Sequence, residues 1–286
     1  YKVINYEYVP SVAMARYSNT FKRKDGVRYE EYLEKVAKGK AKINANAIFP
    51  HDIIKSMDDC VTKYSSAQEQ WNALPNYMEN CNSKVLPVCD VSGSMGVEIS
   101  GSTTAMDICI ALGLYISERN EGIFKNAFIT FSENPKMEYV CGTNLYHKYT
   151  SLQSADWGYN TDLERVFDII LTKAVDFSVL GKEMPDTLLI MSDMEFDRAS
   201  GPHTNFEAIA KLYDNYGYKL PQIVFWNLNA NPGNIPVSFG QQGSVLISGF
   251  SPAILKTILS GEIVDPIKLM IDVVDVKRYL DITLDM

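Results

Sequence analysis

The chain has 286 residues, 46% of them hydrophobic and 22% charged, with a formal net charge of −8 and a pI near 5.0. This apolar content is enough to form a packed core, which excludes an intrinsically disordered chain. The longest apolar run, Ile108 to Ile116, has nine residues, whereas a membrane-spanning helix needs about 20, so we expect no membrane segment.

Residues 1–82 form a helical and irregular N-terminal segment in our interpretation. Apolar residues at helical spacing predict a helix over Tyr29–Lys40, and Pro75 ends a second over Ser65–Leu74. Residues 16–42 contain nine basic and four acidic residues and therefore have a net charge of +5, so the remainder of the chain has a net charge of −13. A stretch of this kind is typical of a solvated helix face, and it also makes contact with RNA or an acidic partner possible.

A polar stretch from Asn76 to Lys84 marks the predicted boundary to a second domain over 83–286. Short apolar runs there alternate with helical patterns. The predicted strands are Val85–Asp90, Ala127–Phe131, Met137–Cys141 (an edge strand), Thr187–Asp193, Gln222–Asn227 and Ser244–Ile247. The predicted helices are Thr104–Arg119, Thr161–Val175, Asn205–Tyr216, Pro252–Leu259 and Pro266–Tyr279. We therefore predict a doubly wound α/β fold whose central sheet is mostly parallel and carries helices on both faces.

Oxygen-bearing side chains collect where two of these strands end, and at one further loop. Asp90, Ser92 and Ser94 follow the first strand at alternate positions, and Asp193 ends another. Thr161 opens a helix after a polar loop. In open α/β sheets, ligands bind at the carboxyl ends of the strands. Two carboxylates and three hydroxyls form an oxygen-only site, which suits Mg²⁺, or Ca²⁺ or Mn²⁺, better than zinc.

This arrangement resembles the metal-ion-dependent adhesion site of von Willebrand factor type A domains, over about residues 85–260. The resemblance implies that Ser92, Ser94 and Thr161 approach the metal. It also implies that Asp90 and Asp193 bind it directly or through water. Segments 9–17, 40–45, 192–197 and 224–228 also resemble domain-of-unknown-function family 2828, whose C-terminal half is such a domain. The layout is similar to that of the Ro ribonucleoprotein autoantigen.

Structural explanations compete for the same residues. Asp90 and Ser92 also suit a turn, and Thr161 with Glu164 forms a capping-box pattern at a helix start. Trp157 and Tyr159 flank the Thr161 loop, where they could form a partner-docking rim or simply pack. Five cysteines, an odd number without a CxxC pair, are interpreted as free and mostly buried thiols.

The leading functional hypothesis is a non-enzymatic protein-interaction domain, in which the type A resemblance implies a partner carboxylate completing the metal site. One alternative is an RNA-associated, ribonucleoprotein-like scaffold that uses the basic stretch 16–42. Another is a metal-dependent phosphohydrolase with Asp90 as nucleophile; it is disfavoured because haloacid-type chemistry needs an acid where Ser92 stands. No charged and apolar leader opens the sequence, and we expect an intracellular, cytoplasmic location.

Overall fold

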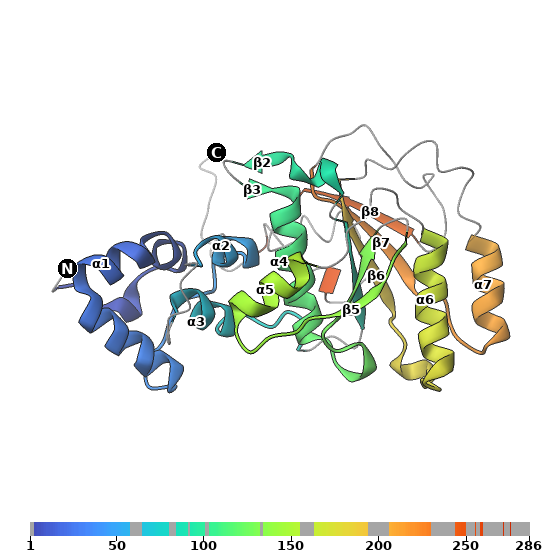
Figure 1. The fold of residues 1–286 in the computed structure, drawn as a ribbon, viewed down its shortest axis with the longest axis horizontal. Helices are drawn as coiled ribbons and strands as arrows, with labels where there is room; N and C mark the ends of the chain where they lie inside the picture. The colour runs from blue at the N-terminus through green and yellow to red at the C-terminus, as the bar shows by residue number, and fades with distance from the viewer. Residues whose placement is uncertain are drawn as a thin grey trace, which may run out of the picture.

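A six-stranded sheet forms the centre of the computed structural model, with helices against both of its faces (Figure 1). The structure describes residues 3–57, 65–79, 84–90, 92–100, 103–131, 134–154, 163–193, 206–229 and 244–249, and the single residues Leu255, Ile258, Leu259, Ile271 and Asp275. The strands are β1 (Val85–Asp90), β2 (Glu98–Ser100), β3 (Thr103–Thr104), β4 (Ala127–Phe131), β5 (Met137–Tyr139), β6 (Thr187–Ser192), β7 (Gln222–Asn227) and β8 (Ser244–Ser248). The helices are α1 (Ser11–Ala37), α2 (Pro50–Lys55), α3 (Ser66–Asn72), α4 (Ala105–Arg119), α5 (Leu145–Gln153), α6 (Leu163–Asp176) and α7 (Phe206–Asn215).

The strand order is β5-β4-β1-β6-β7-β8, and every pair is parallel except the edge pair β4–β5. Each residue of β1, β4 and β6 is buried, as the near-continuous apolar runs of the sequence predict for strands that are covered on both faces. The predicted doubly wound, mostly parallel α/β fold is therefore confirmed, including the edge strand β5, whose antiparallel direction was not predicted. A separate two-stranded hairpin, β2–β3, lies between β1 and α4 and was not predicted.

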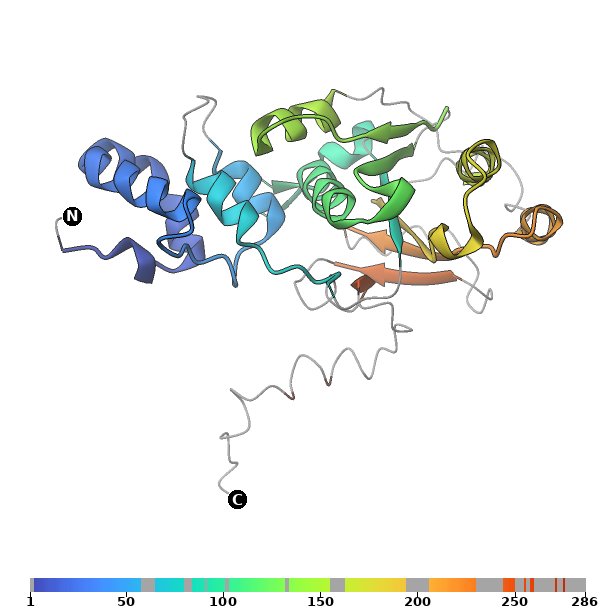
Figure 2. The ribbon, with the colours of Figure 1, turned by 90° about the horizontal axis from the view of Figure 1, so that it is seen from below.

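Helices α4 and α5 lie on one side of the sheet, and α6 and α7 on the other (Figures 1 and 2). α4 is buried almost all round because it packs on β1 with one side and on α2 and α5 with others. α6 and α7 bury one apolar stripe each, which includes Val166, Phe167, Ile170 and Tyr213. Each face of the sheet thus has a hydrophobic core of its own.

The N-terminal helix is longer than predicted. Instead of Tyr29–Lys40, α1 covers Ser11–Ala37 and is kinked at Asp25, whose φ of −148° and ψ of 38° are not helical. The kink interrupts the apolar periodicity on which the prediction depended. The prediction also placed the end too late, because Gly39, with a φ of +68°, already lies beyond the helix. Sequence reasoning missed α2 and α5 as well, which are short or weakly apolar.

The N-terminal segment packs directly on the second part of the chain. Trp71 in α3 is buried in the same hydrophobic cluster as α4, and its Nε1 donates a hydrogen bond to Glu118 Oε2 at 2.6 Å. The Tyr115 hydroxyl of α4 donates to the Pro75 carbonyl at 2.6 Å. Helices α2 and α3 therefore cover α4 on the side that does not face the sheet, and α1 packs in turn on α2 and α3.

Two further expectations concern the C-terminal part and the membrane. The helices predicted at 252–259 and 266–279 lie almost entirely outside the described residues; Leu255, Ile258 and Leu259 pack in the core of the α4 side of the sheet. Among the helices that the structure describes, none combines the length and apolar character that crossing a bilayer requires.

Candidate metal centre

Asp90 and Asp193 lie at the same edge of the sheet. Asp90 is the last residue of β1, and Asp193 directly follows β6, the parallel strand beside it. The β1–β6 register runs without a shift up to Cys89 opposite Met191, so the two strands end together. Each aspartate side chain is only 2% exposed. The prediction that both acids lie at strand ends is confirmed, and the structure shows that the two strands are neighbours.

The loop after β1 places two hydroxyl groups next to each other. Ser92 Oγ and Ser94 Oγ are 3.0 Å apart, and both residues are partly exposed. The Ser92 backbone N–H donates to Asp90 Oδ1 at 2.9 Å, which closes a local turn. Gly93–Gly96 then form a short 3₁₀ helix whose Met95 side chain is completely buried. Met95 thus fixes the loop to the core and holds both hydroxyls above the end of β1.

The Asp90 carboxylate is held from two directions. The Ser192 hydroxyl on β6 donates to Asp90 Oδ2 at 2.5 Å, while Oδ1 accepts from Ser92. Burial raises the pKa of the Asp90 carboxyl, the negative charge of Asp193 adds to that rise, and the hydrogen bonds from Ser192 and Ser92 oppose it. A cation between the two acids would remove the electrostatic penalty that burial imposes on a charged Asp90.

Ser192 is a site residue that sequence reasoning missed. The sequence offered only its position directly before Asp193; the β1–β6 register, which pairs Cys89 with Met191, brings its hydroxyl to Asp90. Thr161, the fifth predicted ligand, lies outside the described residues, as do Trp157 and Tyr159. Four of the five predicted ligands are therefore described, and they come together at one end of the sheet.

The donor set fits a hard cation. The site offers carboxylate and hydroxyl oxygens, which are the ligands of Mg²⁺, Mn²⁺ and Ca²⁺. Within the described ranges, no group of three or more His, Cys, Asp or Glu residues could hold a metal, so a zinc-type cluster is not seen there. Of the three described cysteines, which are all free, Cys89 and Cys109 are buried and Cys141 is exposed.

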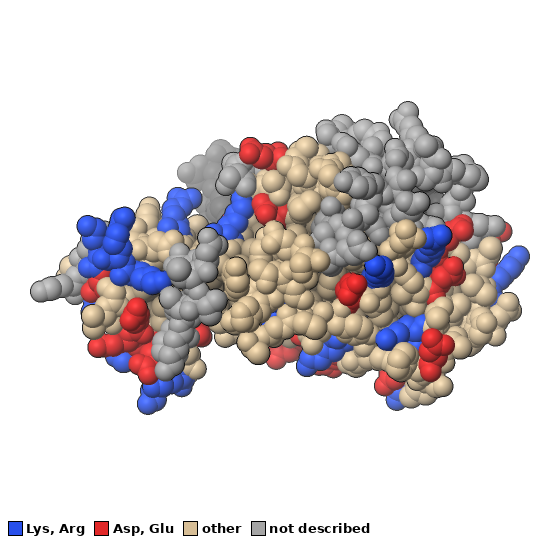
Figure 3. Space-filling view, in the orientation of Figure 1, with Lys and Arg blue, Asp and Glu red and all other residues tan. Residues whose placement is uncertain are grey.

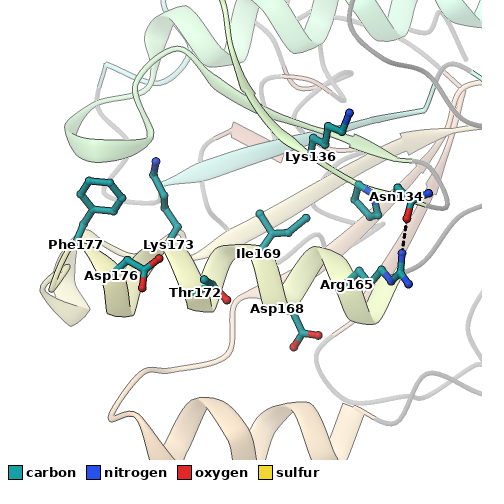
Figure 4. A pocket seen from close by; sticks show the side chains of 10 residues that line it. Asn134, Lys136, Arg165, Asp168, Ile169, Thr172, Lys173, Asp176 and Phe177 are labelled. Carbon is teal, nitrogen blue, oxygen red and sulfur yellow. Dashed lines mark hydrogen bonds between the residues drawn. The ribbon is translucent and has the colours of Figure 1, made fainter.

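A surface groove of about 500 Å³ lies elsewhere, between α6 and the turn that joins β4 to β5. Figure 4 shows Lys173 and Phe177 at one end of it, and at the other Arg165, which hydrogen-bonds to Asn134. The Lys173 ammonium lies 4.3 Å from the centroid of the Phe177 ring. None of the four candidate ligands that the structure describes lines this groove.

Two family models match the chain, and they meet within the polar stretch from Asn76 to Lys84. Residues 1–83 match the family described as Domain of unknown function (DUF2828), and residues 84–279 match Domain of unknown function (DUF7788). The expected resemblance to family 2828 thus holds for the N-terminal segment, while another family matches the α/β part.

One curated relative is the uncharacterised protein L728 of Acanthamoeba polyphaga mimivirus, 31% identical over 293 residues, covering 96% of this chain and 50% of the viral protein. The crystal structure of the Deinococcus radiodurans Ro (RSR) protein superposes with a TM-score of 0.54 and 16% identity, covering 89% of this chain and 54% of that one. Manganese-loaded Plasmodium vivax TRAP protein gives a TM-score of only 0.35, too low to indicate a shared fold. The chain spans about half the length of L728 and of Ro.

The likeness to Ro, at 16% identity, concerns the fold alone. Together with the sheet order and the antiparallel edge strand, it supports a von Willebrand A-like domain. The α/β part thus has a von Willebrand A-like fold. The DUF7788 match covers more than half of the chain, so the protein belongs to the DUF7788 family, a family of unknown function.

Proposed function

We propose that this protein is a non-enzymatic interaction domain that binds protein partners through a divalent metal ion. Asp90, Ser92, Ser94 and Asp193 would hold the ion, together with Thr161 from outside the described residues. An acidic side chain of the partner would complete its coordination. The hydroxyl ligands bring no charge, and an aspartate that binds through water neutralises the ion less than one bound directly, so the ion would keep affinity for one further carboxylate.

The meeting of two buried carboxylates and two neighbouring hydroxyls at one end of the sheet is the observation that carries this proposal, and the distance between the hydroxyls agrees with it. Mg²⁺ binds oxygens at about 2.0–2.1 Å in an octahedron, so two neighbouring ligands are about 2.8–3.0 Å apart. Ca²⁺ distances of about 2.3–2.6 Å would separate such neighbours by roughly 3.3–3.7 Å in the same geometry. Ser92 Oγ and Ser94 Oγ share a hydrogen bond of 3.0 Å, and this separation is compatible with two adjacent ligands of Mg²⁺ or of similarly sized Mn²⁺.

The first test measures whether magnesium stabilises the folded protein. Magnesium should raise the melting temperature of the wild-type protein, because a ligand that binds only the folded state at 100 times its Kd adds about 2.7 kcal/mol to the free energy of unfolding. Ser92→Ala combined with Ser94→Ala should abolish this gain. Ser151→Ala with Ser154→Ala, two hydroxyls on and just after α5, should leave it intact. A wild-type melting temperature that is unchanged across millimolar magnesium would refute the proposed metal site.

The second test measures partner binding. Proteins retained by the immobilised chain in magnesium should be lost in EDTA and lost with the Ser92→Ala/Ser94→Ala variant. Both changes remove the ion that the partner carboxylate needs. The Ser151→Ala/Ser154→Ala variant serves again as the control. Identical sets of partners with magnesium and with EDTA would assign binding to another surface.

An RNA-associated scaffold is the second candidate, favoured by the exposure of the basic stretch. Seven of its nine basic side chains are exposed, and Figure 3 shows Lys and Arg gathered over α1 among acidic residues. Salt-dependent retention of RNA by the wild-type chain should then be lost when Arg16, Arg23 and Lys24 are changed to Glu. Lys211→Glu on the exposed side of α7 is the matched control. RNA retention that is indifferent to both salt and these changes would exclude this candidate.

A further inference from the structure

Ser192 occupies an unusual place between the two candidate metal-binding acids. It is the last residue of β6, its side chain is completely buried, and the next residue in the chain is Asp193. Its hydroxyl donates a hydrogen bond across the strand pair to Asp90 Oδ2. Ser192 is thus hydrogen-bonded to Asp90 and joined by a peptide bond to Asp193.

The hydrogen bonds around Asp90 fix the orientation of its carboxylate. Oδ2 accepts from the Ser192 side chain on β6, and Oδ1 accepts from the Ser92 backbone N–H in the loop at 2.9 Å. Because each oxygen accepts a hydrogen bond, the carboxylate plane cannot rotate without breaking one. A carboxylate oxygen has two acceptor positions, so one that accepts a hydrogen bond can still bind a metal ion or a metal-bound water molecule.

The backbone around Ser192 is equally well placed to act as a rigid support. The β6–β7 register extends to Ser192 opposite Asn227, and the Ser192 carbonyl accepts a hydrogen bond from the Leu228 N–H at 2.9 Å. Ser192 therefore lies on an interior strand that is paired on both sides. A donor in this position can hold Asp90 in one orientation whether or not an ion is present.

We infer that Ser192 is a positioning residue for the metal ion: its hydroxyl orients Asp90 from the neighbouring strand without itself binding the ion. This inference rests on the proposed metal-dependent function. Residues that hydrogen-bond to metal ligands in this way typically contribute 10–100-fold to metal affinity. Replacing the hydroxyl should therefore weaken Mg²⁺ binding, although every proposed ligand remains in place.

The test compares Mg²⁺ affinity, from calorimetric titration and from melting curves at several magnesium concentrations, for Ser192→Ala and the wild type. We expect the dissociation constant to rise about 10–100-fold. Ser117→Ala is the matched control: Ser117 is also completely buried, and its hydroxyl donates to the Ala127 carbonyl at 2.9 Å, at the opposite end of the sheet. It should lose a similar amount of stability and keep the wild-type magnesium affinity.

Two further variants keep the test decisive if Ser192→Ala does not fold. Ser192→Thr retains a hydroxyl and should restore affinity close to the wild type, whereas Ser192→Cys has nearly the same shape but only a weak donor, and should give an intermediate value. A wild-type protein that binds magnesium and Ser192 variants that bind it equally well would overturn this inference alone. A wild-type protein that shows no response to magnesium would overturn the proposed function as well.

Discussion

Asp90 is the residue with the greatest conflict between burial and charge in the described part of the candidate site. Its side chain is 2% exposed, and burial is the main reason that the pKa of its carboxyl is raised. Only hydrogen bonds from Ser192 and Ser92 counteract this rise, while the charge of Asp193 increases it. Such an arrangement is costly for a purely structural aspartate and reasonable for one that binds a cation.

The residue-scale prediction follows from the sign of that shift. A carboxyl with a raised folded-state pKa stabilises the protein at pH values below its unfolded value of about 3.9, and this contribution is lost as the pH rises through the folded-state pKa. Without metal at neutral pH, Asp90→Asn should therefore melt at a higher temperature than the wild type, and the difference should vanish near pH 4. Melting curves from pH 4 to pH 7, with EDTA, provide the measurement.

Added magnesium supplies the control for Asp90→Asn. The wild type should gain stability, while the variant should gain none because it lacks the carboxylate charge. An apo variant that melts below the wild type at neutral pH would show that ionised Asp90 already has sufficient partners without a cation.

At the scale of secondary-structure elements, the close contact between β1 and α4 supports the loop of residues 92–96, which follows β1 and carries Ser92 and Ser94. Gly113 in α4 faces the strand, and an added Cβ there would lie 2.5 Å from Cys89 Sγ. Cys89 immediately precedes Asp90 and is completely buried. The helix can approach the strand this closely only because position 113 has no side chain.

The element-scale prediction compares two helical glycines. Gly113→Ala should lower the free energy of unfolding by about 1–3 kcal/mol, since overpacking outweighs the gain in helix propensity. Gly26→Ala in α1 should instead raise it by up to about 1 kcal/mol, because nothing lies within 4 Å of the added Cβ. Urea unfolding of both variants measures the difference. Equal stabilisation by both changes would mean that β1 and α4 are not in such close contact.

For the molecule as a whole, part of the N-terminal segment shares the hydrophobic core on the α4 side of the sheet, while α1 and its neighbours also form a cluster of their own. Ile53, Ile54 and Trp71 belong to the same buried cluster as the residues of α4. Arg119 also donates to the Trp71 carbonyl at 3.3 Å, and its guanidinium lies over the Tyr115 ring at 3.8 Å from the centroid. These contacts tie α3 to the outer side of α4.

The prediction for the whole molecule concerns removal of the N-terminal segment that packs on α4. A chain that begins at Lys84 should melt well below the full chain or aggregate, because the outer side of α4 becomes exposed. Trp71→Ala, as a single change in the same interface, should cost about 3–5 kcal/mol of unfolding free energy. Tyr8→Ala, at a side chain that is 81% exposed, should have little effect. A stable truncated chain with an unchanged melting temperature would show that the two parts are energetically independent.

Local sequence pattern determined the strands, the parallel sheet and the acids at two strand ends, because buried strands have near-continuous apolar runs and the carboxyl ends of parallel strands meet at one edge. The tertiary structure alone decided what depends on contacts between distant segments. The kink at Asp25 interrupts the helical pattern, while its side chain accepts hydrogen bonds from Tyr6 and Arg28. The role of Ser192 depends on the register of β6 against β1, and the packing of α2 and α3 depends on the apolar outer side of α4. Neither register nor helix docking is encoded within a short stretch of residues, since each is set by the sum of contacts across the whole core.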